Sequence, residues 1–428
     1  METGTDGAVV TARTGETGNA VRRGFGRMRF ETEAERFAHY ARQRRERPVA
    51  QDGDNGFWAV YHYADVQRVL TEHTRFSSQF RAGRQAGLAP VSPEDRDVEN
   101  QAGALAASLI ASDPPRHTQL RNLVNRAFTP RAVLALEATI TDLTNELLDA
   151  AAPHGRMDVM TDLAEPLPVT VIASLLGIPL DDRERFKRWS DHLVGSSEEV
   201  AGGDLDARRR AQEELTDYFR AVIADKRRWP GDDLITALLA AAIDGTSLSE
   251  QDLLGFCVLL LIAGHETTTH LIGNGFLTLL EQPAALQRLQ RQPELVPSAV
   301  EEILRYRSPV QAMGRLAAVD TVLGGERIRA GERVIAWLGS ANRDEAVFPD
   351  PEHFDVARNP NRHLAFGHGV HFCLGAPLAR LEGRIVMEAL VRRLEAPQLE
   401  SAGDAEFSLG FIHGLRHLPI RFAAVTAR

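Results

Sequence analysis

Cysteine is scarce in this chain: two residues, Cys257 and Cys373, occur among 428. Cys257 lies in an apolar run and Cys373 in a glycine-rich loop, and such different surroundings are not typical of a disulfide framework. The sequence therefore excludes a small disulfide-stapled scaffold. It indicates a protein of the reducing cytoplasm.

Long hydrophobic runs and positive charge are also lacking. The longest apolar run, Leu253–Ala263, ends in the polar string Gly264–His270 and is shorter than the roughly 20 residues needed to span a bilayer. The formal net charge is −10, whereas nucleic acids and anionic membranes are held mainly by Lys and Arg. We therefore expect no transmembrane helix, no nucleic-acid partner and no membrane partner, and small molecules are the favoured ligands.

The interior of the chain has no Pro/Gly/Ser-rich linker and no repeat of fixed period. Residues 1–26 are rich in Gly and Thr and show no periodic apolar face. They also lack the apolar core and the cleavage site of a secretory signal. The sequence predicts a disordered tail over 1–26 and a single domain over 27–428.

Helix-forming residues dominate what remains. Apolar residues recur at three- and four-residue spacing over 130–151, 206–229, 249–281 and 376–394, which predicts helices there. Irregular segments are expected over 77–111 and 348–366, which lack periodicity. The predicted fold class is mainly α, a large helical domain with small β-sheets. Strands are expected over Phe57–Tyr63, in a pair formed by Val319–Leu323 and Arg333–Leu338 around Gly324 and Gly325, and over Leu418–Phe422.

The ten residues Phe366–Gly375 place Cys373 between glycines, just before an apolar-periodic helix. Free backbone N–H groups and the positive end of the helix favour a thiolate at this position. Glycines let the backbone come close to a flat cofactor. The loop therefore predicts a sulfur ligand.

Three other interpretations of Cys373 remain open on residue types alone. A buried structural cysteine is common, because free cysteine is among the most buried residue types. A nucleophilic cysteine needs a base, for which His371 is the near candidate. A phosphate-binding loop needs further glycines and a Lys or Ser/Thr at fixed offsets, which are absent.

The polar string Ala263–Thr268 interrupts the apolar central helix with Glu266 and Thr267. Such groups are costly in a core unless each has a partner or a task, so we expect the helix to open locally. The alternative is that the threonines bond back to carbonyl groups within a packed helix. Small residues and a hydroxyl share one helix face and would line a cavity that admits a diatomic ligand: Leu260, Ala263, Gly264, Thr267 and Leu271.

The segment His265–His270 nearly spells the H-E-x-x-H site of zinc hydrolases. Its two histidines are five residues apart, which places them roughly 140° apart around a helix of 3.6 residues per turn. A shared metal needs both on one face. The geometry therefore excludes a zinc site.

Glu302 and Arg305 lie one turn apart on a predicted helix, where they can pair with each other and fix the following loop. Taken alone, such a pair is usually surface decoration. It stands before Ser308-Pro309 and roughly 70 residues ahead of Cys373.

Phe366–Gly375 resembles the haem-binding signature of the cytochrome P450 family, in which the matching cysteine ligates iron. Glu266 and Thr267 resemble that family's acid–alcohol pair, and Glu302 with Arg305 resembles its structural E-x-x-R pair. The resemblance runs from about residue 30 to the end of the chain. The family's P-E-R-F run is replaced by Pro351-Glu352-His353-Phe354, so either His353 or Arg358 would complete the network.

The resemblance implies a cytochrome P450 fold and haem b (iron protoporphyrin IX), with the Cys373 thiolate as axial ligand of the metal. It implies that Glu266 and Thr267 are catalytic and supply protons for dioxygen activation. The two haem propionates need cationic or hydrogen-bonding partners. At family-matching positions these cofactor-binding candidates are His117, Arg121, Arg315 and His371.

The implied reaction is a monooxygenation, either hydroxylation or epoxidation, of a lipophilic small molecule in secondary metabolism, carried out by a cytoplasmic monomer. By family position the substrate pocket includes Leu260, Ala263, Val310, Met313, Phe411 and Ile412, with further contacts expected around 185–205. A haem-thiolate peroxygenase, isomerase or sensor is the alternative class, and Glu266 with Thr267 favours the monooxygenase.

Electrons must come from outside, because the sequence contains no flavin- or nicotinamide-binding unit. We expect ferredoxin and ferredoxin reductase as donors, with an acidic ferredoxin docking on a basic face near the cysteine loop. The candidate arginines are Arg116, Arg121, Arg126, Arg131, Arg358, Arg362, Arg380 and Arg384.

Overall fold

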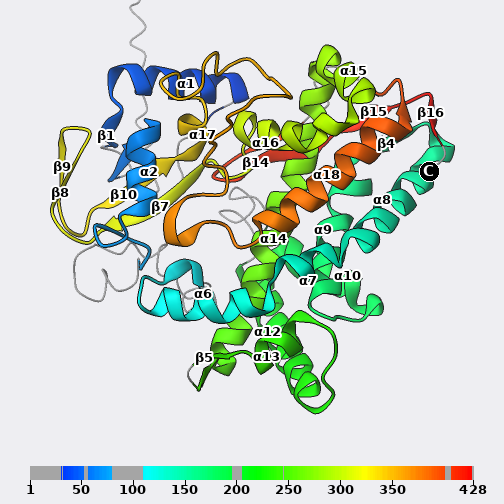
Figure 1. Ribbon diagram of the computed structural model, residues 1–428, viewed down its shortest axis with the longest axis horizontal. Coiled ribbons are helices and arrows are strands. Elements are labelled where there is room, and N and C mark those ends of the chain that lie inside the picture. The colour runs from blue at the N-terminus through cyan, green and yellow to red at the C-terminus, as the bar shows by residue number, and fades with distance from the viewer. Residues whose placement is uncertain are drawn as a thin grey trace, which may run out of the picture.

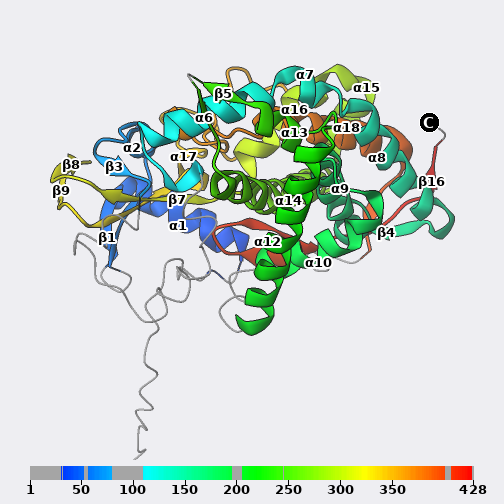
Figure 2. The same cartoon turned by 90° about the horizontal axis from the view of Figure 1, so that it is seen from below.

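The computed structural model shows a helical body beside a smaller region that contains the largest sheet (Figure 1). One long helix passes through the middle of the molecule in both views (Figures 1 and 2). The predicted fold class, mainly α with small β-sheets, is confirmed. The predicted tail over 1–26 lies outside the described residues, as does most of the irregular segment 77–111. The structure describes residues 30, 32–52, 56–79, 109–194, 205–243, 245–400 and 406–426.

All four stretches with helical periodicity are helical, although 130–151 is divided into two helices. The helices are α1 (Glu33–Glu46), α2 (Tyr63–Thr71), α6 (Arg116–Ala127), α7 (Pro130–Leu134), α8 (Glu137–Ala151), α9 (Pro166–Leu175), α10 (Arg183–Val194), α12 (Leu205–Arg228), α13 (Leu234–Ala240), α14 (Glu250–Glu281), α15 (Pro283–Arg291), α16 (Val296–Tyr306), α17 (Leu338–Ala341) and α18 (Ala376–Arg393).

The largest sheet has five strands in the order β1-β2-β10-β7-β3. Alternate residues of β10 enter different apolar clusters: Val334 and Ala336 one, Ile335 and Trp337 the other. Because successive side chains of a strand point to opposite faces, both faces of the sheet are covered at this strand. The strands are β1 (Val49–Asp52), β2 (Phe57–Val60), β10 (Arg333–Trp337), β7 (Ala312–Ala317) and β3 (Phe76–Ser77).

The remaining strands form small sheets. Their bounds are β4 (Arg156–Asp158), β12 (Gln398–Leu399) and β15 (Pro419–Arg421) in one sheet, and the pairs β11 (Leu394–Glu395) with β16 (Ala424–Val425), β13 (Glu406–Leu409) with β14 (His413–His417), β5 (Ala242–Ile243) with β6 (Thr246–Ser247), and β8 (Thr321–Leu323) with β9 (Glu326–Ile328).

The predicted pairing of Val319–Leu323 with Arg333–Leu338 is wrong. Gly324 and Gly325 have φ of 55° and 84° and form a two-residue turn, which can join only the strands that directly flank it. β8 therefore pairs with β9. β10 instead runs parallel to β2 and antiparallel to β7, and no strand was predicted for the β7 segment.

The long central helix is α14, which begins after the N-cap Ser249 with a capping box formed with Asp252. By length and composition α14 could cross a membrane, and it is the one such helix in the described part of the chain. However, 61% of its most apolar window is buried inside the protein. Burial against α9 and α18 on its flanks identifies α14 as the core helix of the body (Figure 1).

The Glu302–Arg305 pair on α16 is fully buried. Both guanidinium–carboxylate hydrogen bonds are 2.8 Å long, so the pair is bidentate. Arg358 completes the network, since its Nε lies 3.1 Å from each Glu302 oxygen. His353 contributes only its backbone carbonyl, which accepts from Arg305 and Arg358. The alternatives left open by the sequence are thus decided in favour of Arg358.

Glu301, the preceding residue, makes a second link to the segment around Cys373. Its carboxylate accepts hydrogen bonds from Arg380 on α18 and lies 3.1 Å from His363 Nε2. Although burial opposes the charge, these partners lower the pKa of Glu301 to about 2. Two neighbouring carboxylates of α16 therefore hold the irregular segment and the start of α18 in place.

Glu302→Ala is expected to lower the free energy of unfolding by about 3–5 kcal/mol, because it leaves two buried guanidinium groups without their carboxylate. Urea unfolding followed by circular dichroism measures the change. The matched control is Asp206→Ala, which breaks the equally spaced but exposed pair with Arg209 and should leave the midpoint unchanged. Equal effects of the two variants would contradict a structural role for the buried pair.

Candidate functional site

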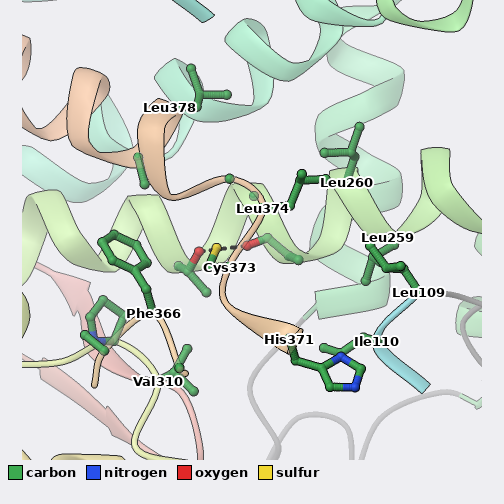
Figure 3. Close-up of a pocket in the computed structure, with 18 of the residues that line it drawn as sticks. Leu109, Ile110, Leu259, Leu260, Val310, Phe366, His371, Cys373, Leu374 and Leu378 are labelled. Carbon is green, nitrogen blue, oxygen red and sulfur yellow. Dashed lines mark hydrogen bonds between the residues drawn. The ribbon is translucent and has the colours of Figure 1, made fainter. Parts of the chain in front are cut away.

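One large cavity lies between α14, the cysteine loop, α6 and β7 (Figure 3). It contains about 1480 Å³ of space not filled by protein atoms, part of it open to solvent. Its walls are mainly apolar with a few polar groups, as is typical of small-molecule and cofactor sites. Besides the predicted residues, the walls include Leu70, Leu109, Ile110, Phe128, Ile172, Phe256, Leu259, Leu304, Leu338, Ala365, Phe366, Leu374, Leu378 and Ala379.

The predicted face of α14 lines this cavity: Leu260, Ala263, Gly264, Thr267 and Leu271 all belong to its wall. Ala263 is exposed although it lies in the middle of the core helix, because the cavity opens at this point. The predicted local opening of the helix is wrong, since α14 is continuous from Glu250 to Glu281. The Thr267 hydroxyl is satisfied within the helix, where it donates to the Ala263 carbonyl at 2.7 Å.

The cysteine loop approaches the cavity through a close contact with α2. Gly369 has φ of 72°, and a Cβ at this position would lie 3.1 Å from the Leu70 carbonyl oxygen. The Cys373 N–H donates to the Phe366 carbonyl at 2.9 Å, which closes the loop behind the sulfur. Cys373 and Phe366 both line the cavity (Figure 3). Position 369 requires glycine for two reasons: its φ is positive, and a side chain there would collide with the α2 backbone.

The expected thiolate is not favoured by the protein alone. Burial raises the pKa of Cys373, and the N–H groups of Gly375 and Ala376 together with the Arg121 charge only partly oppose this. The prediction from the helix end underestimated the cost of burying the charge. A coordinating metal ion deprotonates a thiol outright, so the environment fits a sulfur that is ionised by its ligand.

Cys373 is the cysteine that can hold a metal in this cavity. Cys257 is fully buried in α14, does not line the cavity, and has its pKa raised to about 12 by burial. Within the described ranges no three His, Cys, Asp or Glu side chains are grouped so as to hold a metal ion. A metal bound through Cys373 alone needs its other ligands from a cofactor.

Four predicted cationic or donor residues meet at one edge of the cavity: His117, Arg121, Arg315 and His371. The rings of His117 and His371 lie 4.2 Å apart between centroids. Burial lowers the pKa of Arg315 to about 10, and burial with the Arg315 charge lowers the pKa of His371 to about 3. Both ring nitrogens of His117 are buried without a hydrogen-bond partner. These groups require an anionic or acceptor ligand at this edge.

The cavity therefore fits haem b. It combines one thiol on a wall, apolar side chains around it, and a group of cationic and imidazole side chains at one edge, including the unpartnered His117 ring nitrogens, where two propionates would be held. The His117 ring nitrogens support this fit most strongly. Buried ring nitrogens without partners are unfavourable unless a bound ligand supplies a hydrogen-bond acceptor.

Some predicted site residues are not brought to the cavity. Val310 and Met313 line the cavity. Phe411 and Ile412 are not among the described residues that line it. Phe411 stacks on Trp337, and Ile412 pairs with the Val310 backbone. Both residues lie at the tip between β13 and β14, and their assignment to the substrate pocket stays a prediction.

The acidic residues Glu266 and Glu382 differ in their relation to the cavity. Glu266 lies outside the cavity wall, and its Oε1 is 3.8 Å from His270 Nε2. Glu382 on α18, which sequence reasoning missed, lines the cavity with its Oε2 buried and without a partner. Burial raises the pKa of Glu382 to about 8. An acidic residue among the apolar positions of the predicted helix 376–394 was the available signal.

Comparison with known proteins agrees with this geometry. The sequence model of the family described as Cytochrome P450 matches residues 53–408. The chain is 42% identical over 392 residues to Cytochrome P450 109 of Bacillus spizizenii, covering 90% of this chain and 91% of that protein. It is 39% identical over 381 residues to cyclomarin C epoxidase CymV of Salinispora arenicola, covering 89% and 94%.

Solved structures give the same result. Substrate-free CYP109E1 from Bacillus megaterium superposes with a TM-score of 0.83 at 42% identity, covering 91% of this chain and 98% of that chain. Its complex with testosterone gives a TM-score of 0.80 at 41% identity, covering 90% and 99%. The matched family, the helical fold and the cysteine loop at the cavity thus agree, and the chain belongs to the cytochrome P450 family.

Proposed function

We propose that this cytochrome P450 monooxygenase hydroxylates or epoxidises a lipophilic small molecule of secondary metabolism. The observation that carries the proposal is one apolar cavity lined by both Cys373 and Thr267. A thiol ligand and a hydroxyl that can relay protons then serve the same bound molecule.

Haem b, the cofactor of the family, is bound through a cysteine thiolate, here that of Cys373. We assign the propionate-binding role to His117, Arg121, Arg315 and His371, whose donors gather at one edge of the cavity. When bound, the haem supplies the dioxygen chemistry by which one oxygen atom enters a C–H bond or a C=C bond and the other leaves as water.

The proton supply is assigned to Glu266 and Thr267. The Thr267 hydroxyl now donates to the Ala263 carbonyl, and rotation about its Cβ–Oγ1 bond would direct the same O–H into the cavity. Glu266 is the acidic residue next to it in the chain. A carboxylate that can exchange protons with the hydroxyl is what a relay at this place requires.

The character of the walls supports a lipophilic substrate. Leu260, Ala263, Val310 and Met313 are the predicted pocket residues that line the cavity, and the structure adds Leu109 and Ile110. The similar proteins act on or bind molecules of this type: CymV is named as an epoxidase of cyclomarin C, and CYP109E1 was crystallised with testosterone. Apolar walls with few polar groups bind such molecules by burial of surface.

Electrons are supplied by a redox partner, which we propose to be a ferredoxin with its reductase. Of the predicted basic face, Arg358 is part of the Glu302 network, and three others pair with carboxylates: Arg116, Arg380 and Arg384. Within the described residues no carboxylate lies within ion-pair distance of Arg131 or Arg362. These two are the arginines most available to an acidic partner.

We further propose a monomer in the cytoplasm. Both cysteines are free, and each is buried or lines the cavity, which is compatible with a reducing compartment. We also keep the single-domain assignment of 27–428: the largest apolar cluster extends from Val124 to Phe422 without interruption by a linker.

The reduced carbon monoxide difference spectrum tests the haem-thiolate assignment. The wild type should show the red-shifted Soret band of a thiolate-ligated haem. Cys373→Ser should lose this band, whereas Cys257→Ser, which changes the other cysteine of the chain, should keep it. A Cys373→Ser protein with the wild-type band would refute Cys373 as the ligand.

Thr267→Ala is expected to lower the product formed per electron roughly tenfold or more, because a positioned proton donor typically contributes 10²–10⁴-fold. Peroxide release and product are measured together with a lipophilic compound that shifts the haem spin state. Thr269→Ala is the control, since the Thr269 hydroxyl donates to the Ala164 carbonyl away from the cavity. Unchanged coupling in Thr267→Ala would remove Thr267 from the relay.

Arg362→Glu is expected to lower the rate of ferredoxin-supported haem reduction severalfold and to weaken its salt dependence, since steering depends on charge. Stopped-flow reduction at two ionic strengths measures both. Arg220→Glu on α12, where Arg220 pairs with Asp217 of the same helix, is the control. An equal loss in both variants would count against docking at Arg362.

A further inference from the structure

The imidazole of His270 lies one helical turn beyond Glu266 on α14. Its Nε2 is 3.8 Å from Glu266 Oε1, and the two side chains are 11% and 22% exposed. In the described part of the chain His270 is the one cationic or potentially cationic residue within ion-pair distance of Glu266. The carboxylate of the proposed relay is therefore turned toward His270 and away from the cavity that Thr267 lines.

The other side of the imidazole is closed by β14. A Cβ at Gly414 would lie 2.0 Å from His270 Cγ and Nδ1, so the strand backbone presses against the ring. His270 Nδ1 is buried and has no hydrogen-bond partner. The ring is thus fixed by packing on one side, and its polar contact is directed through Nε2 toward Glu266.

A purely structural histidine explains this arrangement poorly. A buried nitrogen without a partner is unfavourable, and an apolar side chain of similar size would fill the same space without that cost. A metal site is not an alternative, since no third ligand is grouped with His270 and Glu266 among the described residues. What the imidazole adds over an apolar residue is its contact with the Glu266 carboxylate.

We propose that His270 is a positioning residue for the oxygenation: its Nε2 holds the Glu266 carboxylate behind Thr267, ready to turn toward the cavity when the hydroxyl needs a proton. This inference rests on the proposed role of Glu266 in the relay. His270 does not touch the substrate or the cofactor. It acts through Glu266, and Gly414 acts through His270 by fixing its ring.

The test uses the haem-loaded enzyme with ferredoxin, reductase and testosterone, or, if the wild type does not oxidise testosterone, the compound from a lipophilic panel that it does oxidise. His270→Leu should lower the product formed per electron by roughly tenfold. This is the low end of the roughly 10–100-fold loss that is typical when a residue orienting a functional group is removed. His270→Gln, which keeps a donor near the Nε2 position, should restore most of the coupling. Gly414→Ala, which displaces the ring, should lie between the wild type and His270→Leu.

Two readouts separate positioning from a structural role. The urea midpoint of His270→Leu should equal or exceed that of the wild type, because a buried nitrogen without a partner is removed. The carbon monoxide difference spectrum should be unchanged. Cys257→Ala, a buried change in the same helix outside the cavity wall, is the control and should keep wild-type coupling.

A double variant tests whether His270 acts through Glu266. If His270 acts through Glu266, then Glu266→Gln with His270→Leu should be no more uncoupled than Glu266→Gln alone. Wild-type coupling in His270→Leu, or full additivity of the two changes, would overturn the inference while leaving the relay intact. Wild-type coupling in Glu266→Gln would overturn the relay itself and the inference with it.

Discussion

The Glu302 carboxylate is fully buried. It accepts hydrogen bonds from the side chains of Arg305, Arg358 and Asn361 and from the backbone N–H of Asp355. Between Asn342 and Gly375 regular structure is limited to the short 3-10 turn at Gly369–His371. A segment of this length without a hydrogen-bonded ladder must satisfy its backbone through side chains. Arg305 does so directly, since it donates to the carbonyl groups of Asn342, Pro351 and His353. The position of Cys373 thus depends on one buried charge network.

The Glu302 network and the edge of the cavity differ in how far their charges are compensated. Around Glu302 every charge is compensated, and the irregular segment is held rigidly as a result. At the cavity edge Arg315 and His371 are buried close together, and their charged forms are disfavoured, as the lowered pKa of each shows. Asp113, held by Ser77 and the Ser78 N–H, is the carboxylate that acts on Arg315. A rigidly held cysteine segment and an edge with buried, incompletely compensated positive charge suit a site for the anionic edge of a cofactor.

Local sequence patterns predicted what depends on local physics. The expected helix over 249–281 differs from α14 by one residue at its start, because a capping box and Pro283 mark its ends. The cavity face from Leu260 to Leu271 followed from helical periodicity alone. Local patterns could not predict contacts between residues far apart in the sequence. Arg358, which completes the Glu302 network, is 56 residues from Glu302, and β10 pairs with the distant strand β2. The helix end suggested an easily ionised thiol at Cys373, whereas burial, a property of the packed fold, raises its pKa in the absence of a bound metal.

The same distinction applies to Glu266, the acidic residue in the polar string of the central helix. Periodicity puts Glu266 next to Thr267 on α14, yet only the packed structure shows that the carboxylate turns toward His270. That arrangement depends on packing from outside the helix, because the β14 backbone at Gly414 lies close against the imidazole. The hairpin formed by β13 and β14, which carries the predicted substrate contacts Phe411 and Ile412 at its tip, also has a second contact. It packs against the back of α14 and constrains the residue that faces Glu266, while Phe411 stacks on Trp337 of the sheet.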